Sequence, residues 1–213
     1  MQAYGQTEGG PSFSMLHKYE HVDRMIAGDV SRLASAGRPL PQVTVEIRDD
    51  DDHPLPPGEV GEICARSPFL MEGYWDRPAE TAEALRGGFL HTGDMGFVDE
   101  EGFIYIVDRK KDMIISGGVN VYPREVEEVL YQHPAVLEAA VIGVPDPKWV
   151  EAVRALVVLR QGAATTEAKI IKFCGERLAG YKKPKAVEFW DELPKSPAGK
   201  ILKKELRERY SPR

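Results

Sequence analysis

Residues 4–10, Tyr-Gly-Gln-Thr-Glu-Gly-Gly, place a hydroxyl group and a carboxylate among glycines. The hydroxyl of Thr7 can donate a hydrogen bond to a phosphate oxygen, and the carboxylate of Glu8 can hold Mg²⁺ against the same phosphate. The segment has no helical or strand periodicity, so it predicts a loop. An ordinary polar turn has the same composition, and the segment alone does not separate the two interpretations.

Residues 91–94, His-Thr-Gly-Asp, lie between the apolar segments 89–90 and 95–98. Gly93 allows the chain to turn, so that Asp94 points outward from the end of a strand. A carboxylate in that position can accept hydrogen bonds from both hydroxyls of a ribose, as acidic residues do in nucleotide-binding folds. An aspartate that caps a turn is the common alternative. We expect His91 to be structural.

A dense run of charge, Asp-Arg-Lys-Lys-Asp at residues 108–112, separates two apolar runs, 103–107 and 113–115. The apolar runs predict short strands, and the charged run predicts an exposed turn or connector. Gly117 and Gly118 then remove side chains where another group must approach the backbone, although a tight turn has the same requirement.

Residues 194–200, Pro-Lys-Ser-Pro-Ala-Gly-Lys, predict a loop that could enter a cleft. Any single lysine in this tail is ordinarily a solvated surface charge. Lys200 differs from Lys195, Lys203 and Lys204 in its place at the end of the loop. An ammonium group there can bridge carboxylate and phosphate oxygens.

The four motifs, in this order over nearly the whole chain, resemble the AMP-forming acyl-CoA synthetase family. That family also contains peptide-synthetase adenylation domains and firefly-type luciferases. The resemblance implies that a carboxylic acid reacts with ATP, assisted by Mg²⁺, to give acyl-AMP and pyrophosphate, and that the thiol of CoA then displaces AMP.

The resemblance also implies a role for each matching residue. It assigns nucleotide binding to Tyr4 at the adenine, Gly5, Thr7 at the α-phosphate, Asp94 and Arg109 at the ribose, and Asn120. Glu8 would serve the magnesium ion, and Lys111 would orient the substrate. Lys200 matches the adenylation lysine, Asp108 is the hinge, and Gly117 and Gly118 line the CoA channel.

For the fold, the expectation is α+β in two domains. Residues 1–108 would form the antiparallel, barrel-like end of a large adenylate-forming domain, and residues 109–213 a small mobile C-terminal domain. The family's phosphate loop would precede residue 1. We therefore expect a fragment of an acyl-CoA synthetase that is inactive alone.

Hydrophobic periodicity predicts the individual elements. Strands are expected over residues 43–47, 59–65, 137–144, 153–159 and 186–190, and helices over 78–85, 123–132, 166–178 and 201–210, with Gly180 capping the third helix.

Composition limits the alternatives. The formal net charge of −6 gives no reason to expect nucleic-acid binding. Cys64 and Cys174 make no disulfide framework, which favours a reducing cytoplasmic compartment and core positions for both. No apolar run approaches the roughly 18 residues of a transmembrane helix. A non-catalytic binding module that kept the fold is the alternative from another class, and the acid and the oligomeric state stay open.

Overall fold

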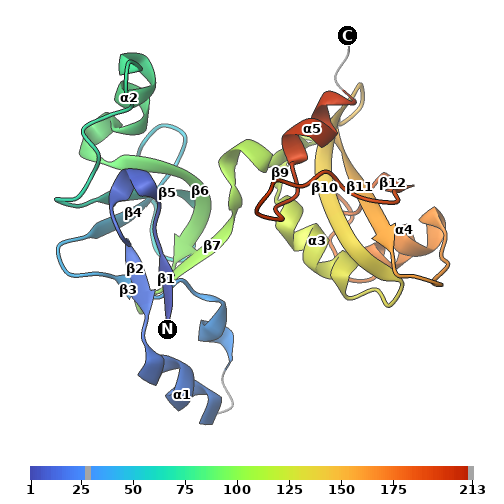
Figure 1. Cartoon of the computed structure of the whole chain (residues 1–213), viewed down its shortest axis with the longest axis horizontal. Coiled ribbons are helices and arrows are strands. Elements are labelled where there is room, and N and C mark those ends of the chain that lie inside the picture. The colour runs from blue at the N-terminus through green and yellow to red at the C-terminus, as the bar shows by residue number, and fades with distance from the viewer. Residues whose placement is uncertain (27–29, 211–213) are drawn as a thin grey trace. The chain divides into compact units, whose positions relative to one another are not determined.

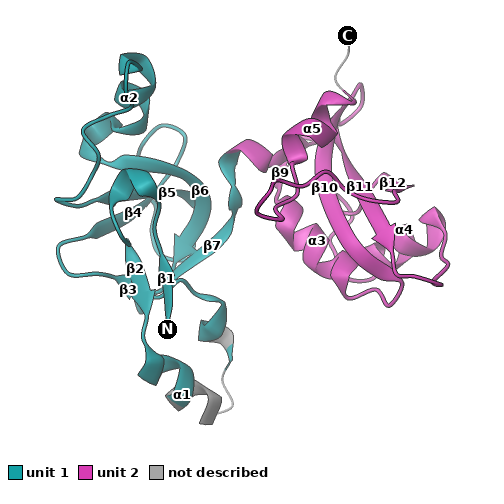
Figure 2. Ribbon diagram, in the orientation of Figure 1, with its two compact units in different colours: residues 1–110 teal, residues 111–213 magenta. Residues whose placement is uncertain are grey.

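The structure is a computed structural model and describes residues 1–26 and 30–210. The chain forms two compact units, Met1–Lys110 and Lys111–Arg213 (Figure 2). The boundary follows Lys110, whereas the sequence placed it after Asp108. Mobility of the second unit remains a prediction.

Unit 1 is built from two antiparallel sheets (Figure 1). The larger sheet has the order β4-β5-β6-β7, so each strand pairs with its neighbour in the sequence. Its strands are β4 (Thr44–Arg48), β5 (Gly61–Arg66), β6 (Leu90–Val98) and β7 (Ile104–Arg109). The smaller sheet contains β1 (Gln2–Tyr4), β2 (Ser14–Leu16) and β3 (Arg38–Pro39).

Short helices complete unit 1. They are the α-helices α1 (Lys18–Ile26) and α2 (Pro78–Ala84) and the 3-10 helices η1 (Thr7–Gly9), η2 (Ser31–Ala34) and η3 (Arg86–Gly88). The core beneath the larger sheet contains the fully buried Ile63 and Ile104, and Phe13 and Leu90 belong to a second apolar cluster. Burying a side chain of this size stabilises the fold by about 1.5–3 kcal/mol.

Unit 2 contains one five-stranded sheet with the order β10-β11-β8-β9, and β12 pairs in parallel with β11. The strands are β8 (Ile114–Ser116), β9 (Val119–Val121), β10 (Val136–Asp146), β11 (Val150–Leu159) and β12 (Ala186–Phe189). The helices are the 3-10 helix η4 (Lys110–Asp112), which begins at the last residue of unit 1, and α3 (Pro123–Tyr131), α4 (Glu167–Gly175) and α5 (Lys203–Glu208).

The central strands of unit 2 are apolar on both faces, because helices cover both. The predicted strand 137–144 lies in one of them, β10. Val141 of β10 packs with Val126 of α3 and Ile170 of α4. The next residue, Ile142, packs on the other side with Leu206 of α5. Successive side chains of a strand point to opposite faces, so a strand covered on both sides reads as a continuous apolar run.

The structure confirms the α+β fold class, with antiparallel strands in unit 1 and a helix that begins at Pro123. Among the described residues, the strands of unit 1 form two open sheets rather than a closed barrel. The predicted helix 166–178 ends at Gly175 instead, so Gly180 does not cap it. Glycine is a poor helix former, by about 1 kcal/mol relative to alanine.

The charged run 108–112 is only partly a connector, because Asp108 and Arg109 belong to β7.

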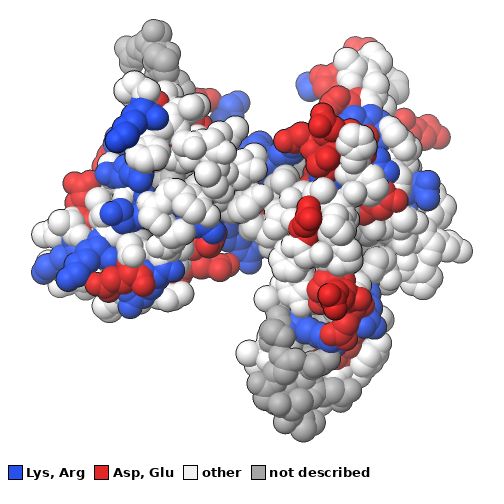
Figure 3. Space-filling model, turned by 180° about the vertical axis from the view of Figure 1, so that it is seen from behind, with Lys and Arg blue, Asp and Glu red and all other residues white. Residues whose placement is uncertain are grey.

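On the face drawn in Figure 3, basic and acidic side chains are interspersed on both units. Within the described chain, no helix is both long and apolar enough to cross a membrane.

Candidate functional site

Three residues that the sequence assigned to the nucleotide meet in unit 1. The Tyr4 hydroxyl donates a hydrogen bond to Asp94 Oδ2 at 2.9 Å, and Arg109 Nε lies 3.4 Å from Asp94 Oδ1. Asp94 and Arg109 are also partners in the β6–β7 ladder. The fold therefore brings together a phenol, a carboxylate and a guanidinium that lie far apart in the sequence.

A local irregularity of β6 presents Asp94. Glu62 pairs with Met95 and Cys64 pairs with His91, so residues 92–94 bulge out of the ladder between β5 and β6. Thr92 stabilises the bulge, since its hydroxyl donates to the carbonyl of Ile63 at 2.7 Å and accepts from the Asp94 N–H at 3.1 Å. Gly93 adopts a φ of 70°, a conformation that favours glycine, as the sequence predicted.

The two charged side chains of this site differ in their exposure to solvent. The Asp94 side chain is 11% exposed, whereas that of Arg109 is 59% exposed. Burial raises the pKa of Tyr4, with Asp94 also raising it, so the phenol stays a donor at neutral pH. Asp94 Oδ2 accepts from this phenol and Asp94 Oδ1 lies near the Arg109 guanidinium, so each carboxylate oxygen faces a donor group.

The first loop forms a short 3-10 turn, η1, with Thr7 exposed and Glu8 half-buried. Glu8 Oε1 accepts a hydrogen bond from the Tyr74 hydroxyl at 3.1 Å, a partner that sequence reasoning missed. At Gly5, an added Cβ would lie 2.7 Å from the backbone of Ser12, which explains the glycine. One carboxylate at such an open loop fits Mg²⁺, which usually binds one or two carboxylates together with substrate phosphates.

In unit 2, the loop around Lys200 is a small hairpin. Ser196 N–H donates to the Lys200 carbonyl at 2.8 Å, and Lys195 forms a bridge with Ile201. Lys195 forms an ion pair with Glu138 at 2.6 Å, and Lys203 forms one with Glu127 at 2.8 Å. Lys200 is exposed and forms no ion pair with any described residue.

The other assigned residues of unit 2 lie between η4 and β9. Lys111 and Asn120 are both exposed. Gly117 and Gly118 form the two-residue turn between the paired residues Ser116 and Val119, with φ of 62° and 80°. A two-residue hairpin turn with positive φ at both positions favours glycine strongly. At Gly117, an added Cβ would also lie 2.9 Å from the Trp149 ring.

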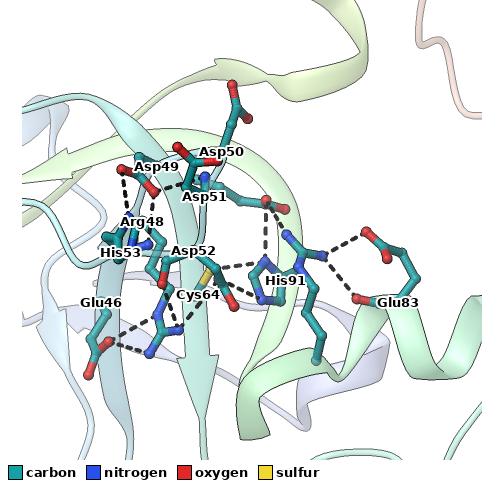
Figure 4. Close-up of polar contacts among 12 residues, drawn as sticks. Glu46, Arg48, Asp49, Asp50, Asp51, Asp52, His53, Cys64, Glu83 and His91 are labelled. Carbon is teal, nitrogen blue, oxygen red and sulfur yellow. Dashed lines mark hydrogen bonds and ion pairs between the residues drawn. The ribbon is translucent and has the colours of Figure 1, made fainter.

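A second polar cluster in unit 1, which sequence reasoning missed, contains Glu62, Cys64 and His91. Figure 4 shows Cys64 beside His91. The His91 Nδ1 atom lies 3.3 Å from both Cys64 Sγ and Glu62 Oε2. Although these residue types bind metals, Lys110 and Arg86 already face the same Glu62 oxygen at 3.2 and 3.5 Å. Burial also raises the pKa of the Cys64 thiol to about 12, which keeps it protonated. The cluster is therefore neutralised by protein cations.

Four consecutive aspartates, residues 49–52, form the turn that follows β4, and Figure 4 shows them beside this cluster. Asp49 Oδ1 accepts hydrogen bonds from the backbone N–H groups of Asp51 and His53 at 3.0 and 2.8 Å. These hydrogen bonds lower the pKa of Asp49. Asp52 Oδ1 lies 3.4 Å from His91 Nε2, so the turn also contacts the buried histidine.

Comparison with known proteins agrees with these motifs. A model of the AMP-binding enzyme family matches residues 1–75, and a model of the AMP-binding enzyme C-terminal domain matches residues 125–200. The long-chain-fatty-acid–CoA ligase of Escherichia coli is 48% identical over 98% of this chain. A feruloyl-CoA synthase of an Amycolatopsis species is 47% identical over 99% of it. The chain spans 35% and 41% of the lengths of these two relatives.

Solved structures show the same likeness. The o-succinylbenzoate CoA synthetase of Bacillus subtilis, solved with an acyl-adenylate intermediate, superposes with a TM-score of 0.84 at 38% identity. That superposition covers 97% of this chain and 40% of the synthetase. The amide bond synthetase of Marinactinospora thermotolerans superposes with a TM-score of 0.83 at 43% identity, over 99% of this chain and 42% of that one. The chain therefore belongs to the AMP-binding, acyl-adenylate-forming enzyme family that its four motifs resemble.

Proposed function

We propose that this chain supplies the C-terminal part of an AMP-forming acid–thiol ligase. In the first step, a carboxylate oxygen of the substrate attacks the α-phosphorus of ATP, and the bond to pyrophosphate breaks. In the second step, the sulfur of CoA attacks the acyl carbon, AMP leaves with the bonding electrons, and the thiol proton is released. Relatives named as fatty-acid and feruloyl ligases support a carboxylic acid as the substrate.

The observation that carries the proposal is the Tyr4–Asp94–Arg109 group in unit 1. In this role, Asp94 accepts hydrogen bonds from the ribose hydroxyls, Arg109 approaches the same sugar, and the Tyr4 ring lies against the adenine. Gly5 and Thr7 continue the site toward the α-phosphate. Mg²⁺, held by Glu8, would neutralise phosphate charge when bound.

The residues of unit 2 would act in two different arrangements. Lys200 would supply positive charge during acyl-AMP formation, with Lys111 and Asn120 orienting the nucleotide and the acid. Gly117 and Gly118 would line the channel for the CoA thiol. Because one set of residues cannot serve both reactions in one pose, unit 2 is expected to move, with the change in backbone torsion near Asp108.

The test compares ATP with 2′-deoxy-ATP in the full-length enzyme that contains this chain. A hydrogen bond to a charged group has a net value of about 1.5–3 kcal/mol. We therefore expect a preference for ATP of roughly 10–150-fold in kcat/KM, since 1.4 kcal/mol is a factor of ten. Asp94→Asn should remove most of this preference.

Asp51→Asn, at an exposed acidic residue of the same unit, is the matched control and should keep the full preference. Equal use of both nucleotides by the unmodified enzyme would overturn the ribose role of Asp94. ATP binding without any acid-dependent turnover would favour the alternative of a non-catalytic binding module.

A further inference from the structure

Glu62 is a buried carboxylate that the proposed reaction does not use. Its side chain is only 6% exposed, and it lies on β5 in the middle of the larger sheet of unit 1. Moving a carboxylate out of water costs several kcal/mol unless other groups compensate its charge. The partners of Glu62 therefore indicate what the fold gains from keeping it there.

The two oxygens of Glu62 hold two different strands. Glu62 Oε1 accepts a hydrogen bond from the Gly93 N–H at 3.0 Å, within the bulge of β6. Glu62 Oε2 lies 3.2 Å from Lys110 Nζ, immediately beyond the end of β7. Gly93 directly precedes Asp94, and Lys110 directly follows Arg109.

The same carboxylate has two further partners, one before β6 and one within it. Arg86, which begins η3, lies 3.5 Å from Oε2, and His91 Nδ1 lies 3.3 Å from it. Burial alone would raise the pKa of Glu62, but Lys110, His91 and the Gly93 N–H outweigh it and lower that pKa. Glu62 therefore remains an anion at neutral pH and holds all its partners at once.

We propose that Glu62 is a positioning residue for the nucleotide site, joining the residue before Asp94 to the residue after Arg109 through one buried carboxylate. This inference rests on the proposed function, because it takes Asp94 and Arg109 as the ribose contacts. Glu62 does not touch the nucleotide. By holding Gly93 and Lys110, it sets the distance between the Asp94 and Arg109 side chains before ATP binds. Such preorganisation from surrounding side chains is what a precise binding site requires.

Two substitutions in the full-length enzyme test this role. Glu62→Gln keeps an oxygen for the Gly93 N–H but removes the charge that holds Lys110, and Lys110→Met removes the ammonium group alone. Each should raise the KM for ATP about 5–30-fold, the factor that corresponds to one or two kcal/mol, with little change of kcat at saturating ATP. Each should also weaken the preference for ATP over 2′-deoxy-ATP. The KM for ATP of the double variant should be no higher than that of the more impaired single variant, because both substitutions remove the same contact.

Two matched controls separate positioning from simple charge compensation. Arg86→Met removes another cation from the same Glu62 oxygen but lies on neither β6 nor β7. Asp50→Asn removes the other ion-pair partner of Lys110. The side chain of Asp50 is 84% exposed, and an ion pair with such an exposed partner contributes little. Both controls should keep the KM for ATP of the unmodified enzyme.

The outcomes are distinct. An active unmodified enzyme whose Lys110→Met variant keeps its KM for ATP and its nucleotide preference would overturn the positioning role, even if Glu62→Gln did not fold. Equal effects of Arg86→Met and Lys110→Met would also overturn it, since charge compensation alone would then explain both. An unmodified enzyme that forms no AMP would instead refute the proposed function.

Discussion

Replacing Lys200 with alanine in the full-length enzyme is expected to slow acyl-AMP formation by about 10²–10³-fold. The first step brings together two anions, so it depends on a positive charge at the transferring phosphoryl group. Lys200 is exposed in its loop and, among the described residues, forms no ion pair that would have to break first. Acid-dependent exchange of pyrophosphate into ATP measures this step.

The second step should be nearly unchanged in the same variant. It is measured separately, as thioester formation from CoA and supplied acyl-AMP. Lys204→Ala is the matched control, because Lys204 lies in the same tail with its side chain 86% exposed. Equal losses in both steps for Lys200→Ala would show that Lys200 is structural.

A side chain at Gly118 is expected to give the opposite result. If Gly118 lines the CoA channel, Gly118→Leu should block thioester formation and spare pyrophosphate exchange. The backbone complicates this variant, because Gly118 has a φ of 80° and a side chain there is strained in any case. Strain of this kind costs roughly 1–3 kcal/mol. The melting temperature must therefore be measured beside both half-reactions.

Gly162 offers a matched control for that strain. It lies in the same unit with a φ of 76°, and, like Gly118, an added Cβ would meet no heavy atom within 4 Å. Gly162→Leu should lower the melting temperature by a similar amount and leave both steps intact in the folded protein. If the two leucine variants lose both steps equally, Gly118 serves only the turn.

The sequence predicted most of the fold because its patterns are local. Pro123 begins α3 as its fixed φ predicts, and the apolar run 137–144 lies in β10, which is buried on both faces. The predicted end of α4, at residue 178, was wrong. The helix ends at Gly175, well before Gly180, which had been expected to cap it. Helix α1 was not predicted, although Tyr19, Val22 and Ile26 recur at helical spacing, a signal in the sequence that was missed.

The site was predictable only as separate motifs. Asp94 and Arg109 could be named from the sequence, but their pairing across β6 and β7 depends on register, which a single motif does not determine. Glu62 gave no sequence signal of its own, since a glutamate in a predicted strand is expected on the exposed face and is rarely buried unless it is paired. Its partner in the bulge of β6, the Gly93 N–H, comes within reach only in the assembled sheet.

We propose that this chain belongs to a ligase that works through an acyl-adenylate. The direct measurement incubates the full-length enzyme with ATP, Mg²⁺ and a panel of fatty and aromatic acids without CoA, and identifies the products by mass spectrometry. We expect one class of acid to give acyl-AMP and pyrophosphate, and added CoA to convert the acyl-AMP into a thioester and AMP. Formation of ADP and phosphate, or of a thioester without any acyl-AMP, would overturn the proposed reaction.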